Sequence, residues 1–315
     1  MNQPCVSLVH DYSVLIATRN RASMLPGCLD AVWGAISKHQ ASAEIIVIDN
    51  GSTDDTPACV HAWSQRSGVE VRLVFEPKPG LSRAQNAGMR VAQGRVFVFT
   101  DDDCRVASDY FTAIEQALLR YGPTVVLGGR VELGDPLDLP VTICTEPDVI
   151  AWQRGRLPLR GRRSPAGIIN GCNLVVPRAV MADVGPFDEN FGSGAFINSG
   201  GDTDFLYRAY CKGILLCYAP SMIVGHFHGR RDRSGVKKLV ASYTAANGAL
   251  YLRYLFSCPE ISLGFIRYLK NWGKEIVRGG NYCWPEMGIT SRDAIRYLVR
   301  GMFRYMGLRM RRLAN

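Results

Sequence analysis

Three consecutive carboxylates, Asp101, Asp102 and Asp103, follow the apolar run of residues 96–99 after a single threonine. Adjacent carboxylates repel one another, and keeping them unpaired in a crevice is costly unless their pKa values rise. A divalent cation removes this cost, and Mg²⁺ or Mn²⁺ typically binds one or two carboxylates together with substrate phosphates. Since side chains alternate along an extended chain, Asp101 and Asp103 can share a face. The cluster therefore predicts a cation site, with a solvated turn that caps the next helix as the alternative.

A second pair of carboxylates, Asp202 and Asp204, lies in the first turn of a helical pattern that opens at residue 200. A carboxylate at this position can act as a general base, or it can satisfy the free N–H groups of the helix start. Two histidines, His226 and His228, follow the next apolar runs. Taken alone, each is a candidate for a buried, hydrogen-bonded histidine.

The elements that must position these side chains are short apolar runs at residues 13–18, 44–49 and 96–99, separated by helical patterns at 24–36 and 82–92. Residues 69–75 alternate as a half-buried strand does. Strands alternating with helices predict parallel βαβ units, whose ligands bind beyond the carboxyl ends of the strands. Thr18, Asp49 and the acidic cluster each follow such an end, so we expect them to converge on one crevice.

Further short strands are expected at residues 171–176, 214–218 and 222–224. Residues 154–163 hold five arginines with Gly and Pro, which indicates a loop that either is simply solvated or clamps phosphate groups. After His228 the chain is basic and mostly helical in pattern. Arg292, Arg296, Arg300 and Arg304 recur every four residues and form one stripe, which faces water, other subunits or anionic lipid.

The chain has 315 residues, 47% of them hydrophobic, with a net charge of +9 and a pI of about 9.1. This size suits one large domain with an appendage. The positive charge favours polyanions or anionic membrane surfaces, or serves only solubility. We expect no nucleic acid partner, because no RNA- or DNA-binding module pattern occurs.

The ten cysteines include no CxxC pair, and neither a leader nor a spanning segment is evident. We therefore expect a cytoplasmic protein with peripheral attachment to the inner face of the membrane.

Seven segments together resemble the family 2 glycosyltransferases, inverting nucleotide-sugar enzymes of the GT-A fold. In order they are residues 13–29 (SVLIATRNRASMLPGCL), 44–56 (EIIVIDNGSTDDT), 80–88 (GLSRAQNAG), 96–104 (VFVFTDDDC), 184–192 (VGPFDENFG), 201–209 (GDTDFLYRA) and 224–228 (VGHFH). The resemblance implies an α/β, Rossmann-like, mainly parallel sheet flanked by helices, with a C-terminal helical extension. It divides the chain into a GT-A domain at 1–229, with a nucleotide-binding half to about 105 and an acceptor half from 106 to 229, and a basic helical region at 230–315.

The resemblance also implies roles for individual residues. Asp101 and Asp103 match the DxD pair, His226 matches a histidine that completes the metal site in some members, and Asp202 matches the acceptor-side base. The implied nucleotide-sugar site consists of Thr18, Arg19, Asn20, Asp49, Gly51, Arg83, Asn86, Asp101 and Asp102. The implied cofactor is Mn²⁺ or Mg²⁺.

Two positions depart from the family pattern. Many members read GEDTD where this chain has Gly200 and Gly201 before Asp202, which leaves Asp202 and Asp204 as rivals for the base. Many members also carry Arg or Lys where Gln85 stands, so a diphosphate contact is expected from Arg83 or from the arginine-rich loop instead. His228 remains the rival of His226.

The implied function is the metal-dependent, inverting transfer of a sugar from a nucleotide diphosphate, UDP by preference, to a hydroxyl of a saccharide or lipid-linked acceptor. The implied process is cell-surface polysaccharide or glycolipid synthesis. A non-catalytic nucleotide-sugar-binding protein or assembly partner of the same fold is the main alternative. A nucleotidyltransferase is less favoured, because residues 18–22 (TRNRA) lack the glycine cluster that such enzymes need after the first strand.

Overall fold

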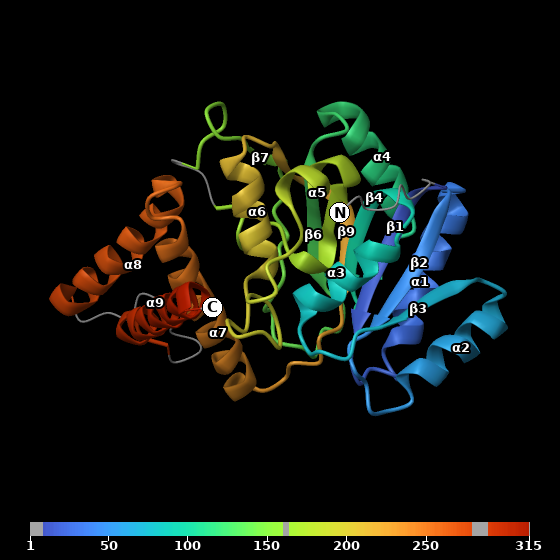
Figure 1. Ribbon diagram of the computed structural model, residues 1–315, viewed down its shortest axis with the longest axis horizontal. Helices are drawn as coiled ribbons and strands as arrows, with labels where there is room; N and C mark the ends of the chain where they lie inside the picture. Colours follow the sequence, from blue (N-terminus) through green and yellow to red (C-terminus); the bar gives the residue numbers. More distant parts are fainter. Residues whose placement is uncertain (1–8, 160–163, 279–288, 315) are drawn as a thin grey trace.

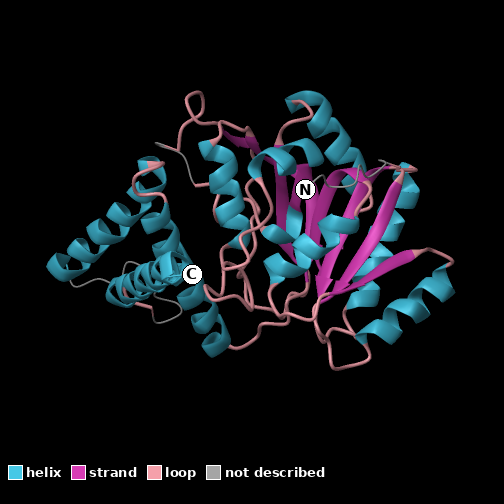
Figure 2. Cartoon of the chain, in the orientation of Figure 1, coloured by secondary structure: helices cyan, strands magenta, loops and turns pink. Residues whose placement is uncertain are grey.

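A computed structural model describes residues 9–159, 164–278 and 289–314. The chain folds into a sheet flanked by helices, followed by three further helices (Figures 1 and 2). The strands are β1 (His10–Thr18), β2 (Ala43–Asp49), β3 (Val71–Phe75), β4 (Gly94–Asp101), β5 (Cys104–Val106), β6 (Val126–Leu133), β7 (Ile150–Trp152), β8 (Leu174–Pro177) and β9 (Leu216–His226). The helices are α1 (Leu25–His39), α2 (Thr56–Ser67), α3 (Leu81–Val91), α4 (Tyr110–Tyr121), α5 (Arg178–Val184), α6 (Gly201–Cys211), α7 (Arg233–Arg253), α8 (Pro259–Arg278) and α9 (Ser291–Ala314).

The strands lie in the order β3-β2-β1-β4-β8-β6-β9-β5, with β7 beside β9. Strands β3, β2, β1 and β4 are parallel, and the predicted α/β fold class is confirmed. The second half is mixed, because β8 runs antiparallel to both β4 and β6, while β6 and β9 are parallel. Side chains on the two faces of the sheet form two separate hydrophobic cores under the flanking helices.

The strand register explains why polar residues meet at one edge. Thr18 pairs with Asp49 across β1 and β2, and Ala17 pairs with Asp101 across β1 and β4. All three strands are parallel, so their carboxyl ends lie at the same edge. The expected convergence of Thr18, Asp49 and the acidic cluster on this edge is thus present in the fold.

Some element boundaries differ from the sequence expectation. Residues 171–173 form a single 3₁₀ turn, so the expected strand at 171–176 begins only at Leu174. The two expected strands at 214–218 and 222–224 are one strand, β9, which passes a register shift opposite Gly129 and Arg130 of β6. Helix α2 was not expected from the sequence. Residues 160–163 of the arginine-rich loop lie outside the described residues.

Helices α7, α8 and α9 pack together on the side of the molecule opposite the β3 edge (Figure 1). The predicted C-terminal helical extension is therefore present. In the arginine stripe of α9, Arg292, Arg296 and Arg300 are exposed and Arg304 is half-buried. None of the helices in the described ranges is long and apolar enough to cross a membrane.

Candidate active site

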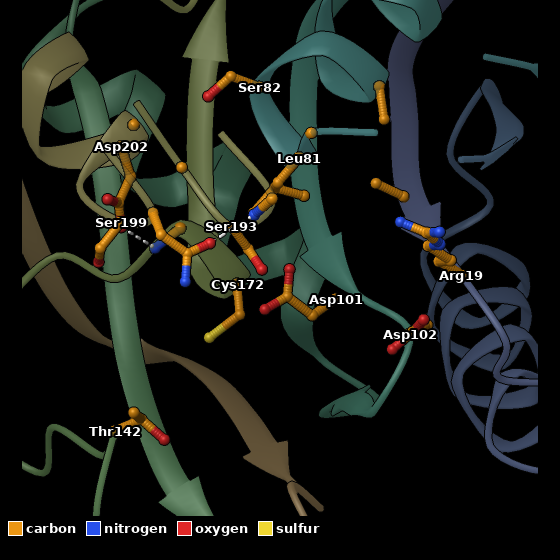
Figure 3. Close-up of a pocket in the computed structure, with 18 of the residues that line it drawn as sticks. Arg19, Leu81, Ser82, Asp101, Asp102, Thr142, Cys172, Ser193, Ser199 and Asp202 are labelled. Carbon is orange, nitrogen blue, oxygen red and sulfur yellow. Dashed lines mark hydrogen bonds between the residues drawn. The ribbon is translucent and has the colours of Figure 1, made fainter. Parts of the chain in front are cut away.

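A cavity of about 600 Å³ opens at the carboxyl edge of the sheet. The ends of β1 and β4, the start of α3, the start of α6 and the end of β9 supply its walls, and α7 closes one side. In Figure 3, Asp202 lies on one side of this cavity, Asp101 near the middle, and Arg19 and Asp102 on the other side. The acidic cluster therefore faces a cavity of the size that ligand sites have.

The three carboxylates have different surroundings. Asp102 accepts a hydrogen bond from Thr18 Oγ1 at 2.7 Å and lies 3.7 Å from Arg21 Nε. Asp103 Oδ1 lies 3.3 Å from His226 Nε2, and Asp103 Oδ2 lies 3.7 Å from Arg21 Nη2. Among the described residues, no basic side chain lies within ion-pair distance of Asp101. Asp101 is thus the member of the cluster without a directly paired cation, although the charge of His226 acts on it from a distance.

The pKa values follow from these surroundings. Burial, reinforced by the charge of Asp103, raises the pKa of Asp101 to about 7. Burial also raises the pKa of Asp102 to about 6, against the hydrogen bond from Thr18. Burial opposes ionisation of Asp103 too, but the hydrogen bond and charge of His226 outweigh it and hold that pKa below its usual value. Burial works to lower the pKa of His226, yet Asp103 outweighs it and the pKa is raised. A cation placed here would remove the penalty on Asp101.

The donor atoms of Asp103, Cys104 and His226 lie within 4.8 Å of one another, close enough to share one ion. Sheet pairing brings them together, because Cys104 of β5 stands opposite His226 of β9. Cys104 was not among the predicted ligands, and a hydrogen bond with Cys172, together with burial, raises the pKa of its thiol. Carboxylate and imidazole ligands with a neutral thiol suit Mn²⁺ or Mg²⁺ better than a thiolate-preferring ion. Asp103 and His226 of the implied metal site therefore fit the cation, whereas Asp101 is not part of this group of donor atoms.

Asp202 and Asp204 point to different places. Asp202 lines the cavity from the first turn of α6, where its Oδ2 accepts the N–H of Gly171 at 2.9 Å and its Oδ1 accepts the N–H of Thr203 at 2.7 Å. Burial raises the pKa of Asp202 despite these N–H donors. A carboxylate held in this way is a stronger proton acceptor than an exposed one.

Asp204 is fully buried and belongs to a different network. It accepts hydrogen bonds from Arg208 Nε at 2.9 Å and from Tyr254 OH at 2.9 Å, and it lies 3.3 Å from Arg253 Nε. Arg253 and Tyr254 stand at the end of α7, so Asp204 ties α6 to the C-terminal helices. This geometry favours Asp202 over Asp204 as the group that meets a substrate.

The two histidines are also separated by their positions. His226 lines the cavity beside Asp103, whereas His228 is not among the cavity residues. His228 Nδ1 accepts the backbone N–H of Arg230 at 3.0 Å, and burial lowers the pKa of this histidine. The geometry therefore favours His226 over His228 as a ligand.

Not every residue of the implied nucleotide-sugar site lines the cavity. Thr18, Arg19, Asp101 and Asp102 do. Asn20 and Asp49 support the neighbouring loop instead, since Asn20 Oδ1 accepts the N–H of Thr53 and Asp49 Oδ1 accepts the N–H of Ser52.

The remaining three implied residues also have structural partners. Gly51 has a φ of 75°, which the turn after β2 requires. Arg83 pairs with Glu189 at 2.7 Å, and the Asn86 side chain bonds the backbone of Phe187. In this structure, Asn20, Asp49, Gly51, Arg83 and Asn86 surround the site without lining the cavity.

Several cavity residues were missed by sequence reasoning. Asn50, Ser82 and Gln85 come from segments that were recognised, and Asn50 Oδ1 also accepts the backbone N–H of Gly80 at 2.8 Å. Others come from the segment around the start of α7, which was assigned to a separate region: Arg230, Lys238, Ser242 and Tyr243. The basic run after His228 was the available signal, because a cation-rich segment adjoining an acidic site suits a phosphate ligand.

Comparison with known proteins agrees with this geometry. Residues 13–146 match the sequence model of Glycosyl transferase family 2. "Glycosyltransferase AglE" of Haloferax volcanii is 27% identical over 214 residues, covering 68% of this chain and 66% of the relative. "Succinoglycan biosynthesis protein ExoO" of Rhizobium meliloti is 32% identical over 110 residues, covering 35% of this chain and 30% of the relative. The matches thus span less than two thirds of these relatives' lengths.

Solved structures resemble the whole fold. The mannosyltransferase PcManGT of Pyrobaculum calidifontis, in complex with GDP-Man and Mn²⁺, has a TM-score of 0.59 at 16% identity over 94% of this chain and 87% of its own. TarS residues 1–349 of S. aureus in complex with UDP has a TM-score of 0.52 at 16% identity, over 74% of this chain and 64% of its own. At such identities the likeness concerns the fold. The chain therefore has the GT-A fold, and residues 13–146 of it match Glycosyl transferase family 2.

Proposed function

We propose that this protein is a metal-dependent, inverting glycosyltransferase that moves a sugar from a nucleotide diphosphate to the hydroxyl of a saccharide or lipid-linked acceptor. One observation carries the proposal: a single cavity holds Asp101, Asp103 and His226 on one wall and the half-buried carboxylate Asp202 on another. Leaving-group stabilisation and proton removal are the two tasks of glycosyl transfer, and each wall suits one of them.

The first wall binds the donor. A divalent cation held by Asp101, Asp103 and His226 would act as a Lewis acid on the diphosphate oxygens. Arg19 and Arg21 line the same side of the cavity, where their guanidinium groups can bind phosphate oxygens. The neighbours crystallised with UDP and with GDP-Man and Mn²⁺ support a nucleotide-sugar donor and a divalent cation. We propose a UDP-sugar by preference.

The second wall removes the proton. Asp202 accepts the proton of the acceptor hydroxyl while that oxygen forms a bond to the anomeric carbon. The bond from this carbon to the diphosphate oxygen breaks, and the nucleoside diphosphate leaves with the electron pair. Attack from the face opposite the leaving group inverts the anomeric centre, and a single base suffices. The N–H groups of Gly171 and Thr203 fix the carboxylate in place for this step.

We propose a place in cell-surface polysaccharide or glycolipid synthesis, which the name of the succinoglycan relative supports. The second candidate is a non-catalytic nucleotide-sugar-binding protein, favoured by Gly201, which stands where many members have an acid. The intact Asp202 with its raised pKa favours the enzyme over this alternative.

The experiment is release of nucleoside diphosphate from a panel of UDP-, GDP- and TDP-sugars with Mn²⁺, with and without a chelator. We expect release from one donor, lost with the chelator and with Asp103→Asn. His228→Gln is the matched control, because His228 lies near the site but does not line the cavity. Donor binding without release, unaltered by Asp202→Asn, would favour the non-catalytic candidate. Full turnover in metal-free buffer would overturn the proposed metal dependence.

A further inference from the structure

Helix α8 exposes a continuous apolar face. Val277 is 83% exposed and Ile276 66% exposed, whereas the first turn of the helix buries Ile261 and Ser262. The exposed apolar side chains recur at helical spacing: Leu263, Ile266, Leu269, Trp272, Ile276 and Val277. Soluble surfaces rarely carry a contiguous apolar patch of this kind unless it contacts something.

A row of cations borders this apolar face. Arg267, Lys270, Lys274 and Arg278 are three or four positions apart, so they lie along one edge of α8, and all four are exposed. The two acids of the helix are engaged elsewhere. Glu260 accepts the Tyr210 hydroxyl at 2.5 Å, and Glu275 accepts the N–H of Ser291 at 2.9 Å. The outward charge of α8 is therefore positive.

The turn before α8 extends the same surface. Phe256 is 91% exposed and Leu255 is 42% exposed. Arg154, in the arginine-rich loop after β7, donates to the carbonyl of the adjacent Ser257 at 3.3 Å, so this loop lies beside the turn (Figure 1). Arg154 and Arg156 are both exposed. Two segments far apart in sequence thus meet here, and Arg154 lies beside the turn that carries the exposed ring of Phe256.

We propose that this docking surface, namely the outer face of α8 with residues 255–256 and Arg154 and Arg156, binds an anionic lipid bilayer. An apolar face with Trp and Leu beside a row of Lys and Arg is what an interfacial helix needs to lie in the headgroup region. A second copy of the chain would bring like cation rows together, which is unfavourable. A nucleic acid would satisfy the cations but not the apolar face. This docking goes beyond the proposed transfer reaction and does not depend on it.

The test is co-sedimentation of the full chain with vesicles of equal parts phosphatidylcholine and phosphatidylglycerol, against vesicles of phosphatidylcholine alone. We expect binding to the anionic vesicles only, weakened by added salt. Since each cation near an anionic surface contributes about fivefold in binding, Lys270→Gln with Lys274→Gln should weaken it roughly 30-fold. The pair Phe256→Ser with Val277→Ser should weaken it at least about tenfold, because two exposed apolar side chains no longer enter the interface.

Matched controls lie on α4 and at the start of β4, away from α8. Leu119→Ser removes an apolar side chain that is 80% exposed, and Arg95→Gln with Arg120→Gln removes two positive charges. These variants should bind vesicles as the wild type does.

Donor turnover without vesicles should be unchanged in all variants, which separates a failure of docking from a failure of the proposed reaction. No binding to anionic vesicles, or equal losses in the controls, would overturn the proposal. Self-association of the wild type that Phe256→Ser with Val277→Ser abolishes would assign the surface to a second copy instead.

Discussion

Asp202→Asn and Asp204→Asn make the same chemical change two positions apart in α6, and we expect opposite effects. Asp204 is fully buried against Arg208, Arg253 and Tyr254. Removing one partner of a buried ion pair typically costs about 3–5 kcal/mol. Other groups compensate in part, since Arg253 also pairs with Asp188 at 2.7 Å. We therefore expect Asp204→Asn to lower the free energy of unfolding by about 3 kcal/mol and Tm by roughly 6–10 °C.

Asp202→Asn should leave stability nearly unchanged. The amide oxygen can still accept one of the N–H groups of Gly171 and Thr203, and loss of the other bond costs about 1 kcal/mol. Burial raises the pKa of Asp202, so the folded protein pays to keep this carboxylate ionised, and a neutral amide offsets part of the loss. Without a proton acceptor, however, turnover should fall by about 10²–10⁴-fold.

The assay combines three measurements on each variant: Tm by calorimetry, nucleotide affinity by titration, and nucleoside diphosphate release at saturating donor well below Tm. Asp202→Asn should lose turnover while it keeps Tm and nucleotide affinity, and Asp204→Asn should show the reverse. If Asp204→Asn loses turnover at wild-type Tm, the assignment of the base is wrong. Near wild-type turnover of Asp202→Asn would refute the role of Asp202 altogether.

Three further outcomes are expected. Mn²⁺ with UDP at about 100 times its Kd should stabilise the wild type by roughly 2.7 kcal/mol in calorimetry, and Asp103→Asn should show no such gain; equal gains would contradict the metal assignment. Because the pKa of Asp202 is raised, the carboxylate loses its charge as the pH falls through that raised value. Turnover should therefore begin to decline at a pH above the usual carboxyl pKa of about 4. A pH–rate profile that stays flat down to about pH 4 would contradict this role. Gly201→Ala should lower the free energy of unfolding by about 1–3 kcal/mol in denaturant titration, because a Cβ at this position would collide with Ser82 Oγ. Adding Ser82→Ala should recover part of the lost stability. A Gly201→Ala variant as stable as the wild type would show that the backbone adjusts freely.

The parallel half of the fold was predictable from sequence, because its strands are continuous apolar runs that each end in polar residues. Parallel strands present their carboxyl ends together, so Thr18 and Asp101 could be brought to one edge without a structure. The proximity of Asp103 and His226 rested on the family resemblance alone. It depends on the antiparallel pairing of β5 with β9, between segments more than a hundred residues apart, and no local pattern encodes that register.

The departure at Gly201 also has a physical reason that the sequence did not reveal. Ser82 Oγ donates to the carbonyl of Phe191 and fills the space where a Cβ of residue 201 would lie. A glutamate at this position would therefore need a different arrangement of the start of α3. The cavity residues of α7 were missed for a related reason, since helical periodicity shows which residues share a face but not which cavity that face meets.

Helix α7 has two roles in the architecture, because Ser242 and Tyr243 line the cavity while Arg253 and Tyr254, near its end, hold Asp204 of α6. The half of the site built on the sheet and the half built on α7 can thus diverge at different rates. Changing the side chains of this single helix could therefore alter which ligand the cavity accepts while the sheet edge stays the same.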